Sequence, residues 1–338
     1  MGASHQGVRQ RRSAVMRNWR SWPSKHHRLA RKLWREATAE KTMPSPDPST
    51  DVTLGRVNAG PRGIDHAVDL IAGRRVLALT GAGLSTDSGI PDYRGPGSPP
   101  RTPMTYAEFV SGEAAQRRYW ARALVGWRQL SYADPNPGHH ALAALERGGV
   151  VTGLITQNVD GLHSRAGQHQ LIDLHGRVAN VVCLTCRHSS SRREVHRRLS
   201  DLNPHVADRT GTIAPDGDAV LDDVDGFQLV RCACGGALKP DVVFFGENVP
   251  RDRVAHAMGW LDQAEVLLVA GSSLHVMSGF RFVRRAAEAG IPVIIINRGS
   301  TRGDALATRK LEMGCAQALT DLAYAVRAPD SAVHHQPA

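Results

Sequence analysis

The chain of 338 residues is long enough to bury a full hydrophobic core, and its 41% hydrophobic and 22% charged residues are typical of a globular protein. The longest apolar runs, Val266–Ala270 and Val293–Ile296, are far shorter than the ~18 residues of a membrane-spanning helix, so an integral membrane protein of that kind is excluded. Residues 1–42 hold 11 Lys or Arg and two acids, which accounts for +9 of the net charge of +10, so a basic nucleic-acid-binding body is disfavoured.

Residues 1–50 form a basic extension that ends in a Pro- and Ser-rich linker from Met43 onward. This composition predicts disorder, and we expect the same of the tail at 326–338. Two alternatives remain for the extension: it is an organelle transit peptide, or translation starts at Met43. The Ala-, Arg-, Gly- and Asp-rich body is typical of a high-GC bacterial gene, which favours the Met43 start and a cytoplasmic protein over one in the mitochondrial matrix of a eukaryote.

From residue 62 onward the sequence alternates between helical and strand patterns. The spacing of apolar residues predicts helices over 64–71, 139–147 and 280–289. Continuous apolar runs predict buried strands over 75–80, 149–156, 265–270 and 292–296. Such an alternation indicates an α/β fold, a Rossmann-like parallel sheet with helices on both faces. We assign this domain to 51–182 and 236–325, with a small module inserted at 183–235.

Each predicted strand ends in small or polar residues, at the edge where open α/β sheets bind ligands. After the first strand, Gly81-Ala-Gly83 offers a tight turn and a place where backbone N–H groups can approach a pyrophosphate. The glycine pattern of dinucleotide-binding folds breaks at Thr86, which leaves a plain tight turn as an equal alternative. The Pro- and Gly-rich segment Ile90–Pro100 comes directly afterwards and has the composition of a lid.

Five cysteines are too few for a secreted disulfide framework at this length. Four of them form two close pairs, Cys183 with Cys186 and Cys232 with Cys234. Four thiolates at such spacing suit one tetrahedral, structural zinc ion, with free thiols or a redox pair as alternatives. Only one residue separates the second pair, and we expect the glycines at 235 and 236 to relax the resulting turn.

Six motifs, in order along the chain, resemble those of the sirtuins, the NAD-dependent protein deacylases. The motifs are Gly81–Arg94, Gln157–His163, Leu174–Gly176, Lys239–Glu247, Gly271–Leu274 and Asn297–Gly299. The resemblance covers about residues 62–325, and Tyr93 with the segments 118–122, 126–127 and 214–218 is similar to the class II branch, which includes mitochondrial sirtuin four and its bacterial relatives. The second cysteine pair departs from the family, which usually has two residues between these cysteines.

The resemblance implies that NAD lies across the carboxyl edge of the sheet. It assigns the pyrophosphate and nicotinamide-ribose side to Gly81, Ala82, Gly83, Ser85, Thr86, Gly89, Ile90, Pro91, Asp92, Tyr93 and Arg94. It assigns the surroundings of the nicotinamide to Gln157, Asn158, Val159 and Asp160, and the phosphates and adenosine to Gly271, Ser272, Ser273, Asn297, Arg298, Gly299 and Cys315. Turn chemistry is the alternative for Asn158 and Asp160, and a small buried side chain is the alternative for Cys315.

The resemblance also implies three catalytic residues, His175, Asn158 and Asp160. An imidazole with a pKa near ~6.5 can take a proton from a ribose hydroxyl at neutral pH, which is the role implied for His175. In the family reaction, the acyl-lysine oxygen attacks C1′ of the ribose, nicotinamide leaves, and the deprotonated hydroxyl attacks the resulting imidate. Water then releases lysine and O-acyl-ADP-ribose. The implied partners are acyl-lysine proteins and NAD, and the alternatives are protein mono-ADP-ribosyl transfer and a lipoamidase-type deacylase.

The acyl group is less constrained by the sequence. Tyr119 and Arg122 lie three residues apart and share a helix face, which resembles the acidic-acyl pocket of malonyl- and succinyl-lysine sirtuins. The stretch before Pro135 is longer than in that branch, which leaves a solvated helix face as the alternative. We expect Phe244–Glu247 and the loop after it to form the edge where a substrate peptide adds as a strand, with an ordinary buried strand as the alternative.

Overall fold

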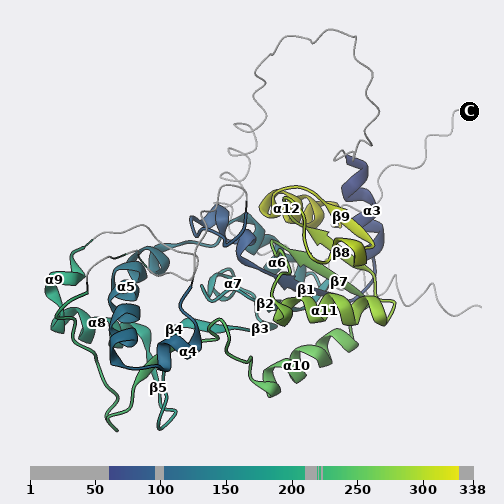
Figure 1. The fold of residues 1–338 in the computed structure, drawn as a ribbon. Coiled ribbons are helices and arrows are strands. Elements are labelled where there is room, and N and C mark those ends of the chain that lie inside the picture. Colours follow the sequence, from purple (N-terminus) through teal and green to yellow (C-terminus); the bar gives the residue numbers. More distant parts are fainter. Residues whose placement is uncertain (1–60, 96–102, 210–218, 220, 222–223, 327–338) are drawn as a thin grey trace, which may run out of the picture. The chain divides into compact units, whose positions relative to one another are not determined.

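The computed structural model describes residues 61–95, 103–209, 219, 221 and 224–326 (Figure 1). The basic extension at 1–50, part of the predicted lid, most of the segment 210–223 and the tail from 327 onward lie outside the described residues. Within the part of the chain that is described, no helix is long and apolar enough to cross a membrane.

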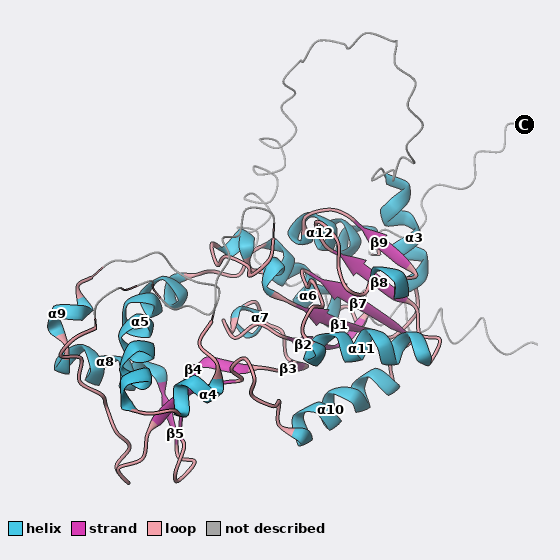
Figure 2. Ribbon diagram, in the orientation of Figure 1, coloured by secondary structure: helices cyan, strands magenta, loops and turns pink. Residues whose placement is uncertain are grey.

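Six strands form a parallel sheet in the order β3-β2-β1-β7-β8-β9 (Figure 2). The strands are β1 (Val76–Thr80), β2 (Val151–Thr156), β3 (Leu171–Asp173), β7 (Val266–Ala270), β8 (Val293–Ile296) and β9 (Arg309–Leu311). The four predicted strands are confirmed to within two residues at each end. Strands β1, β7 and β8 are buried along their whole length, because both faces of the sheet are covered.

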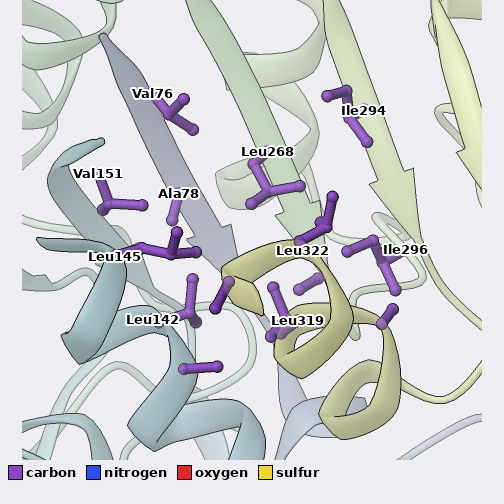
Figure 3. Packing of buried hydrophobic residues seen from close by; sticks show 14 of the residues in the cluster. Val76, Ala78, Leu142, Leu145, Val151, Leu268, Ile294, Ile296, Leu319 and Leu322 are labelled. Atoms are coloured by element: carbon purple, nitrogen blue, oxygen red, sulfur yellow. The ribbon is translucent and has the colours of Figure 1, made fainter. Parts of the chain in front are cut away.

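Alternate residues of each strand point to opposite faces, and each face has its own hydrophobic core. The first face carries Val76, Ala78, Leu268 and Ile294 and is covered by three helices (Figure 3). These helices are α3 (Pro61–Ile71), α6 (Pro137–Arg147) and α12 (Cys315–Ala325). Burial of a Val, Leu or Ile side chain stabilises the fold by about 1.5–3 kcal/mol. The alternation of side chains along the strands therefore decides which face of the sheet each helix covers.

The second face carries Leu77, Leu79, Leu267 and Ile295 and packs against two helices. These helices are α10 (Arg251–Asp262) and α11 (Met277–Glu288). The predicted helices at 64–71, 139–147 and 280–289 correspond to α3, α6 and α11, which confirms a Rossmann-like parallel sheet with helices on both faces.

A second core surrounds an antiparallel sheet of three strands in the order β5-β4-β6. We call this part the smaller lobe; it consists of β4 (Gly176–Cys183), β5 (Ser189–Ser191), β6 (Leu238–Val242), α4 (Tyr106–Val110), α5 (Glu113–Tyr132), α8 (Arg192–Leu202) and α9 (Pro204–Ala207). Phe109 and Trp120 from the first two of these helices pack in the same core as Leu199 and Leu238. Helices that precede position 183 therefore share a core with the predicted module.

Short helical segments come after the carboxyl ends of β1, β2 and β8. They are η2 (Ala82–Leu84), η3 (Thr86–Ser88), α7 (Leu162–Arg165) and η4 (Asp304–Leu306). Because all six strands run the same way, the segments after β1, β2, β3, β7 and β8 meet at one edge of the sheet.

Candidate active site

A cavity of about 980 Å³ lies along this carboxyl edge. Its volume is near the upper end of the range for small-molecule and cofactor sites. Every residue predicted to bind NAD lines the cavity except Gly89, and His175 lines it too. Gly89 instead ends η3 with a φ of 82°, a backbone conformation that glycine adopts without strain.

The glycine segment after β1 is shaped by its contact with the segment after β7. A Cβ atom on Gly81 would lie 2.8 Å from the carbonyl oxygen of Gly271, and one on Gly83 would lie 3.0 Å from it. The Gly83 N–H donates to the same oxygen at 2.8 Å. Gly81 itself has an extended backbone with a φ of −139°, and its carbonyl accepts the Leu84 N–H at 3.0 Å, so the predicted tight turn is present and begins at Gly81. These glycines allow two strand ends to approach each other closely.

Ser85, Asn158 and Asp160 form one hydrogen-bonded network behind β1 and β2. The Asn158 amide donates to the Gly81 carbonyl at 3.1 Å and to Ser85 Oγ at 3.0 Å. Ser85 Oγ donates to Asp160 at 2.7 Å, and the other Asp160 oxygen accepts the backbone N–H of Leu162 at 2.9 Å. Burial raises the pKa of Asp160, and these two hydrogen bonds oppose the rise. The network fixes three predicted site residues in one arrangement at the cavity.

Gln157 joins the ends of β2 and β7. Its side-chain amide donates to Ser272 Oγ at 2.8 Å and to the Thr80 carbonyl at 3.3 Å. Ser272 Oγ also accepts the backbone N–H of Leu274, which has a φ of 58°. Positive φ is uncommon for a residue with a branched side chain, and such conformations cluster at functional sites.

His175 lies directly after β3 and Leu174, and both of its ring nitrogens are within hydrogen-bonding distance of a partner. Nδ1 lies 2.9 Å from the Gln157 carbonyl oxygen, and Nε2 lies 2.8 Å from the Ser278 hydroxyl. Burial, together with the positive charges of Arg253 and Arg281, lowers the pKa of His175 to about 4. The ring is therefore neutral at physiological pH and has a lone pair that can accept a proton.

The far part of the cavity is built by the segment after β8 and the start of α12. The Asn297 amide donates to the carbonyl oxygens of Arg298 at 2.7 Å and Gly299 at 3.3 Å, which folds this segment back on itself. Cys315 is the first residue of α12, and its thiol donates to the Ile296 carbonyl at 3.6 Å. Burial raises the pKa of Cys315 to about 12, so the thiol stays protonated and packs as a small side chain.

The segment Phe244–Glu247 lines the cavity and is braced by Lys239. Lys239 is only 4% exposed and donates to Glu247 Oε2 at 2.9 Å, and the same oxygen accepts the backbone N–H of Phe244 at 2.9 Å. The Phe245 carbonyl accepts the backbone N–H of the first residue of α4. These two backbone groups are already paired within the chain, so an added peptide strand has to use other groups of this segment or of the loop after it.

Tyr119 and Arg122 both lie on α5, but only Tyr119 lines the cavity. Tyr119 is buried and packs edge-on against Phe109 and Phe244. Arg122 Nε donates to the Ala219 carbonyl at 3.0 Å, and the Arg122 carbonyl accepts the Ala219 N–H. The two side chains therefore do not meet at the cavity as an acidic-acyl pocket would require.

The four paired cysteines converge in the smaller lobe. All four Sγ atoms lie within 4.8 Å of one another, with 3.6 Å between Cys183 and Cys234 and 3.7 Å between Cys186 and Cys232. Zn–S bonds of about 2.3 Å in a tetrahedron require sulfur atoms about 3.8 Å apart. The tetrad therefore fits one zinc ion with four protein ligands and no open position.

Two glycines shape the short turn of the second cysteine pair. Gly235 has a φ of 81°, and its N–H donates to the Cys232 carbonyl at 2.9 Å. A Cβ atom on Gly236 would lie 2.6 Å from Cys183 Sγ. A side chain at 236 would collide with the tetrad, whereas one at 235 would meet open space but strain the backbone of the turn.

Sequence reasoning missed several residues of the cavity, above all Ser278 and Arg281 of α11. Ser278 contacts His175 across 103 positions of sequence, so no local pattern links the two residues. The available signal was its place four residues after the motif Gly271–Leu274 and two residues before the helix predicted at 280–289.

Comparisons with known proteins agree with this geometry. Residues 81–278 match the model of the Sir2 family. A Mycobacterium avium protein named NAD-dependent protein deacetylase 1 is 54% identical over 278 residues, which cover 80% of this chain and 97% of that protein. A Streptomyces coelicolor protein of the same name is 51% identical over 281 residues, covering 82% and 92%. A solved structure named Sir2-p53 peptide-NAD+ aligns with a TM-score of 0.62 and 31% identity over 78% of this chain and 96% of its own. The chain therefore belongs to the Sir2 family.

Proposed function

We propose that this protein removes acyl groups from protein lysine in a reaction that consumes NAD and yields nicotinamide and O-acyl-ADP-ribose. The observation that carries the proposal is the neutral His175 imidazole, which lines the cavity with both ring nitrogens oriented by hydrogen bonds. The two deacetylases that are about half identical to this chain, and the related structure named for a p53 peptide and NAD, support the same activity.

NAD supplies the ribose carbon from which nicotinamide departs. In the proposed reaction, Ser85, Asn158 and Asp160 orient the nicotinamide ribose, because their polar atoms are already fixed at the cavity wall. His175 then holds the proton of a ribose hydroxyl on its unprotonated ring nitrogen. The segments at 81–83 and 271–273 bind the phosphates, and the segment at 297–299 with Cys315 binds the adenosine.

We propose that the preferred acyl group is uncharged. Near Tyr119 the cavity wall is aromatic, and the Arg122 guanidinium is engaged by the Ala219 carbonyl. A carboxylate buried without a partner costs several kcal/mol, so acetyl and longer aliphatic or lipoyl chains fit this wall better than malonyl or succinyl.

We propose that the cysteine tetrad holds one structural zinc ion, since its geometry fits and none of the four cysteines lines the cavity. The class II relationship, the domain limits and the Met43 start stay predictions. The bacterial origin of the relatives favours the cytoplasm over the mitochondrial matrix as the place of action.

The test combines the full chain, NAD and a panel of peptides that carry acetyl-, octanoyl-, lipoyl- or succinyl-lysine. Nicotinamide release and peptide mass are followed for the unchanged protein, for His175→Ala and for His169→Ala, which alters an exposed histidine outside the cavity. We expect acyl loss that requires NAD, that falls by at least about 10²-fold in His175→Ala and that persists in His169→Ala.

Nicotinamide release with no acyl loss, accompanied by an ADP-ribose mass on a protein, would show that the chain is a mono-ADP-ribosyltransferase instead. Acyl loss that proceeds without NAD would contradict the whole proposal.

A further inference from the structure

Ser278 occupies the side of His175 on which a base has to accept a proton. The Gln157 carbonyl oxygen can only accept a hydrogen bond, so at 2.9 Å it requires that Nδ1 carries the hydrogen of the neutral ring. Nε2 is then the unprotonated nitrogen, and the Ser278 hydroxyl at 2.8 Å donates to it. The lone pair of the base is thus already bonded to a hydroxyl of the protein.

The surroundings of the ring keep His175 in this neutral form. The side chain is largely buried, and two cations face it, Arg253 of α10 and Arg281 of α11, both of which disfavour a charged ring. Arg253 is held in place by the carbonyl of Leu174, the residue directly before His175. The tautomer set by Gln157 is therefore the form that a substrate meets.

The fold positions Ser278 through the same residue that orients His175. Ser278 is the second residue of α11, and Gly279 is the third. A Cβ atom on Gly279 would lie 2.4 Å from Gln157 Oε1, so a side chain here would push the Gln157 amide away from Ser272 and Thr80. One contact between α11 and the end of β2 thus places both hydrogen-bond partners of the imidazole.

We propose that Ser278 is a further catalytic residue, which relays the proton of the ribose hydroxyl to His175. Ser278 lines the same cavity as His175, so its oxygen is accessible to a hydroxyl bound there. The inference rests on the proposed function, because it assigns a path to the proton of that reaction.

The relay moves two protons in one step. The ribose hydroxyl gives its proton to Ser278 Oγ while the proton that Ser278 carried moves to His175 Nε2. The ribose oxygen keeps the electron pair of the broken O–H bond and uses it to attack the acyl carbon. Ser278 ends the step as a hydroxyl, and His175 ends it as an imidazolium with a hydrogen on each nitrogen.

The test uses single turnover with an acetyl-lysine peptide and NAD, for the unchanged chain, Ser278→Ala and Ser278→Thr. Thr320→Ala removes an exposed hydroxyl on α12 and serves as the matched control. In Ser278→Ala we expect acyl loss to slow on the order of 10²-fold, with nicotinamide release changed far less, because the relay acts after nicotinamide departs. Ser278→Thr keeps the hydroxyl and should recover most of the rate.

Mixtures of H₂O and D₂O report how many protons move in the slow step. For the unchanged chain, the relay predicts that the rate of acyl loss plotted against the fraction of D₂O is a curve, because two protons move. For Ser278→Ala it predicts a straight line, because one proton moves. If Ser278 only supported the fold, the substitution would leave the shape of this plot unaltered. If the unchanged chain removes the acyl group and Ser278→Ala removes it equally fast, the relay is overturned and the proposed function stands. An unchanged chain that releases nicotinamide with no acyl loss overturns the relay and the proposed function together.

Discussion

The two sheets of the molecule hold their key side chains by different means. At the edge of the parallel sheet, Asn158 and His175 are oriented by the backbone carbonyls of Gly81 and Gln157, which directly follow strands β1 and β2. In the smaller lobe, the antiparallel sheet has three strands and a register shift between Gly176 and Val181, and four thiols converge beside it. A substitution at the first site should remove function and leave the fold, whereas loss of the metal at the second should remove the fold of that lobe.

Loss of a zinc ligand should give the largest effect. Metal binding at small structural zinc sites contributes on the order of 10 kcal/mol to folding, and part of that should be lost in Cys186→Ser. We expect the unchanged protein, purified with no chelator, to contain about one zinc and the variant less than half as much. Limited proteolysis should then cleave the smaller lobe of the variant first.

Cys315→Ser is the matched control for this experiment, since Cys315 is the cysteine outside the tetrad. It should keep its zinc and its resistance to protease. Full zinc content in Cys186→Ser, or cleavage that begins in the parallel sheet, would mean that the metal does not hold the smaller lobe.

Acid should lower the stability of the part of the molecule that holds the parallel sheet, because two neutral histidines, His139 and His163, are buried side by side there. Burial lowers the pKa of His139 to about 4 and that of His163 well below its usual value. The unfolded chain therefore binds more protons than the folded chain between about pH 6.5 and pH 4, so the free energy of unfolding falls as the pH is lowered through that window. The loss from His139 alone is about 3 kcal/mol.

Urea unfolding at pH 7, 6, 5 and 4 measures this slope. His139→Gln should flatten it, whereas His205→Ala, which removes an exposed histidine of α9, should not. A slope of equal steepness in His139→Gln would assign the acid sensitivity to other groups.

Asn158→Ala should give a smaller loss of stability together with a large loss of acyl removal. The change leaves the Gly81 carbonyl without one donor and frees Ser85 to turn away from Asp160, at a cost of about 1–3 kcal/mol. Thermal unfolding and acyl loss are measured beside Asn180→Ala, an exposed asparagine of β4. Normal activity in Asn158→Ala would show that the network supports the fold alone.

The parallel sheet could be predicted because its central strands are continuous apolar runs, which only a doubly covered sheet buries. Strand β9 was missed, since Arg309 and Lys310 are half-buried at the sheet edge and give no apolar signal. Helix α5 was expected only around Tyr119 and Arg122 and not over its 20 residues, because buried Trp120 and Leu124 alternate with exposed arginines and its partners lie in two different parts of the chain.

The cavity could be predicted where motif and strand end coincide, as for Asn158 and His175. Contacts between distant segments could not be predicted, because nothing in a local pattern shows that Gly81 must leave room for Gly271 or that Ser278 reaches His175. The same limit applies to Arg122. Its spacing from Tyr119 predicts a shared role, whereas in the structure its side chain donates to the distant Ala219 carbonyl.

Arg122→Met should give the smallest change in stability and activity. It tests directly whether a side chain of the smaller lobe affects the choice of acyl group at the cavity. The change removes one hydrogen bond, to the Ala219 carbonyl in the smaller lobe, and should cost about 1 kcal/mol of stability. Because the guanidinium does not line the cavity, the ratio of activity on acetyl-lysine to activity on succinyl-lysine should stay the same. Tyr119→Phe is the companion variant, since Tyr119 does line the cavity and its substitution should alter that ratio. A selective loss on succinyl-lysine in Arg122→Met would mean that the arginine turns into the cavity when substrate binds, and that the smaller lobe helps to choose the acyl group.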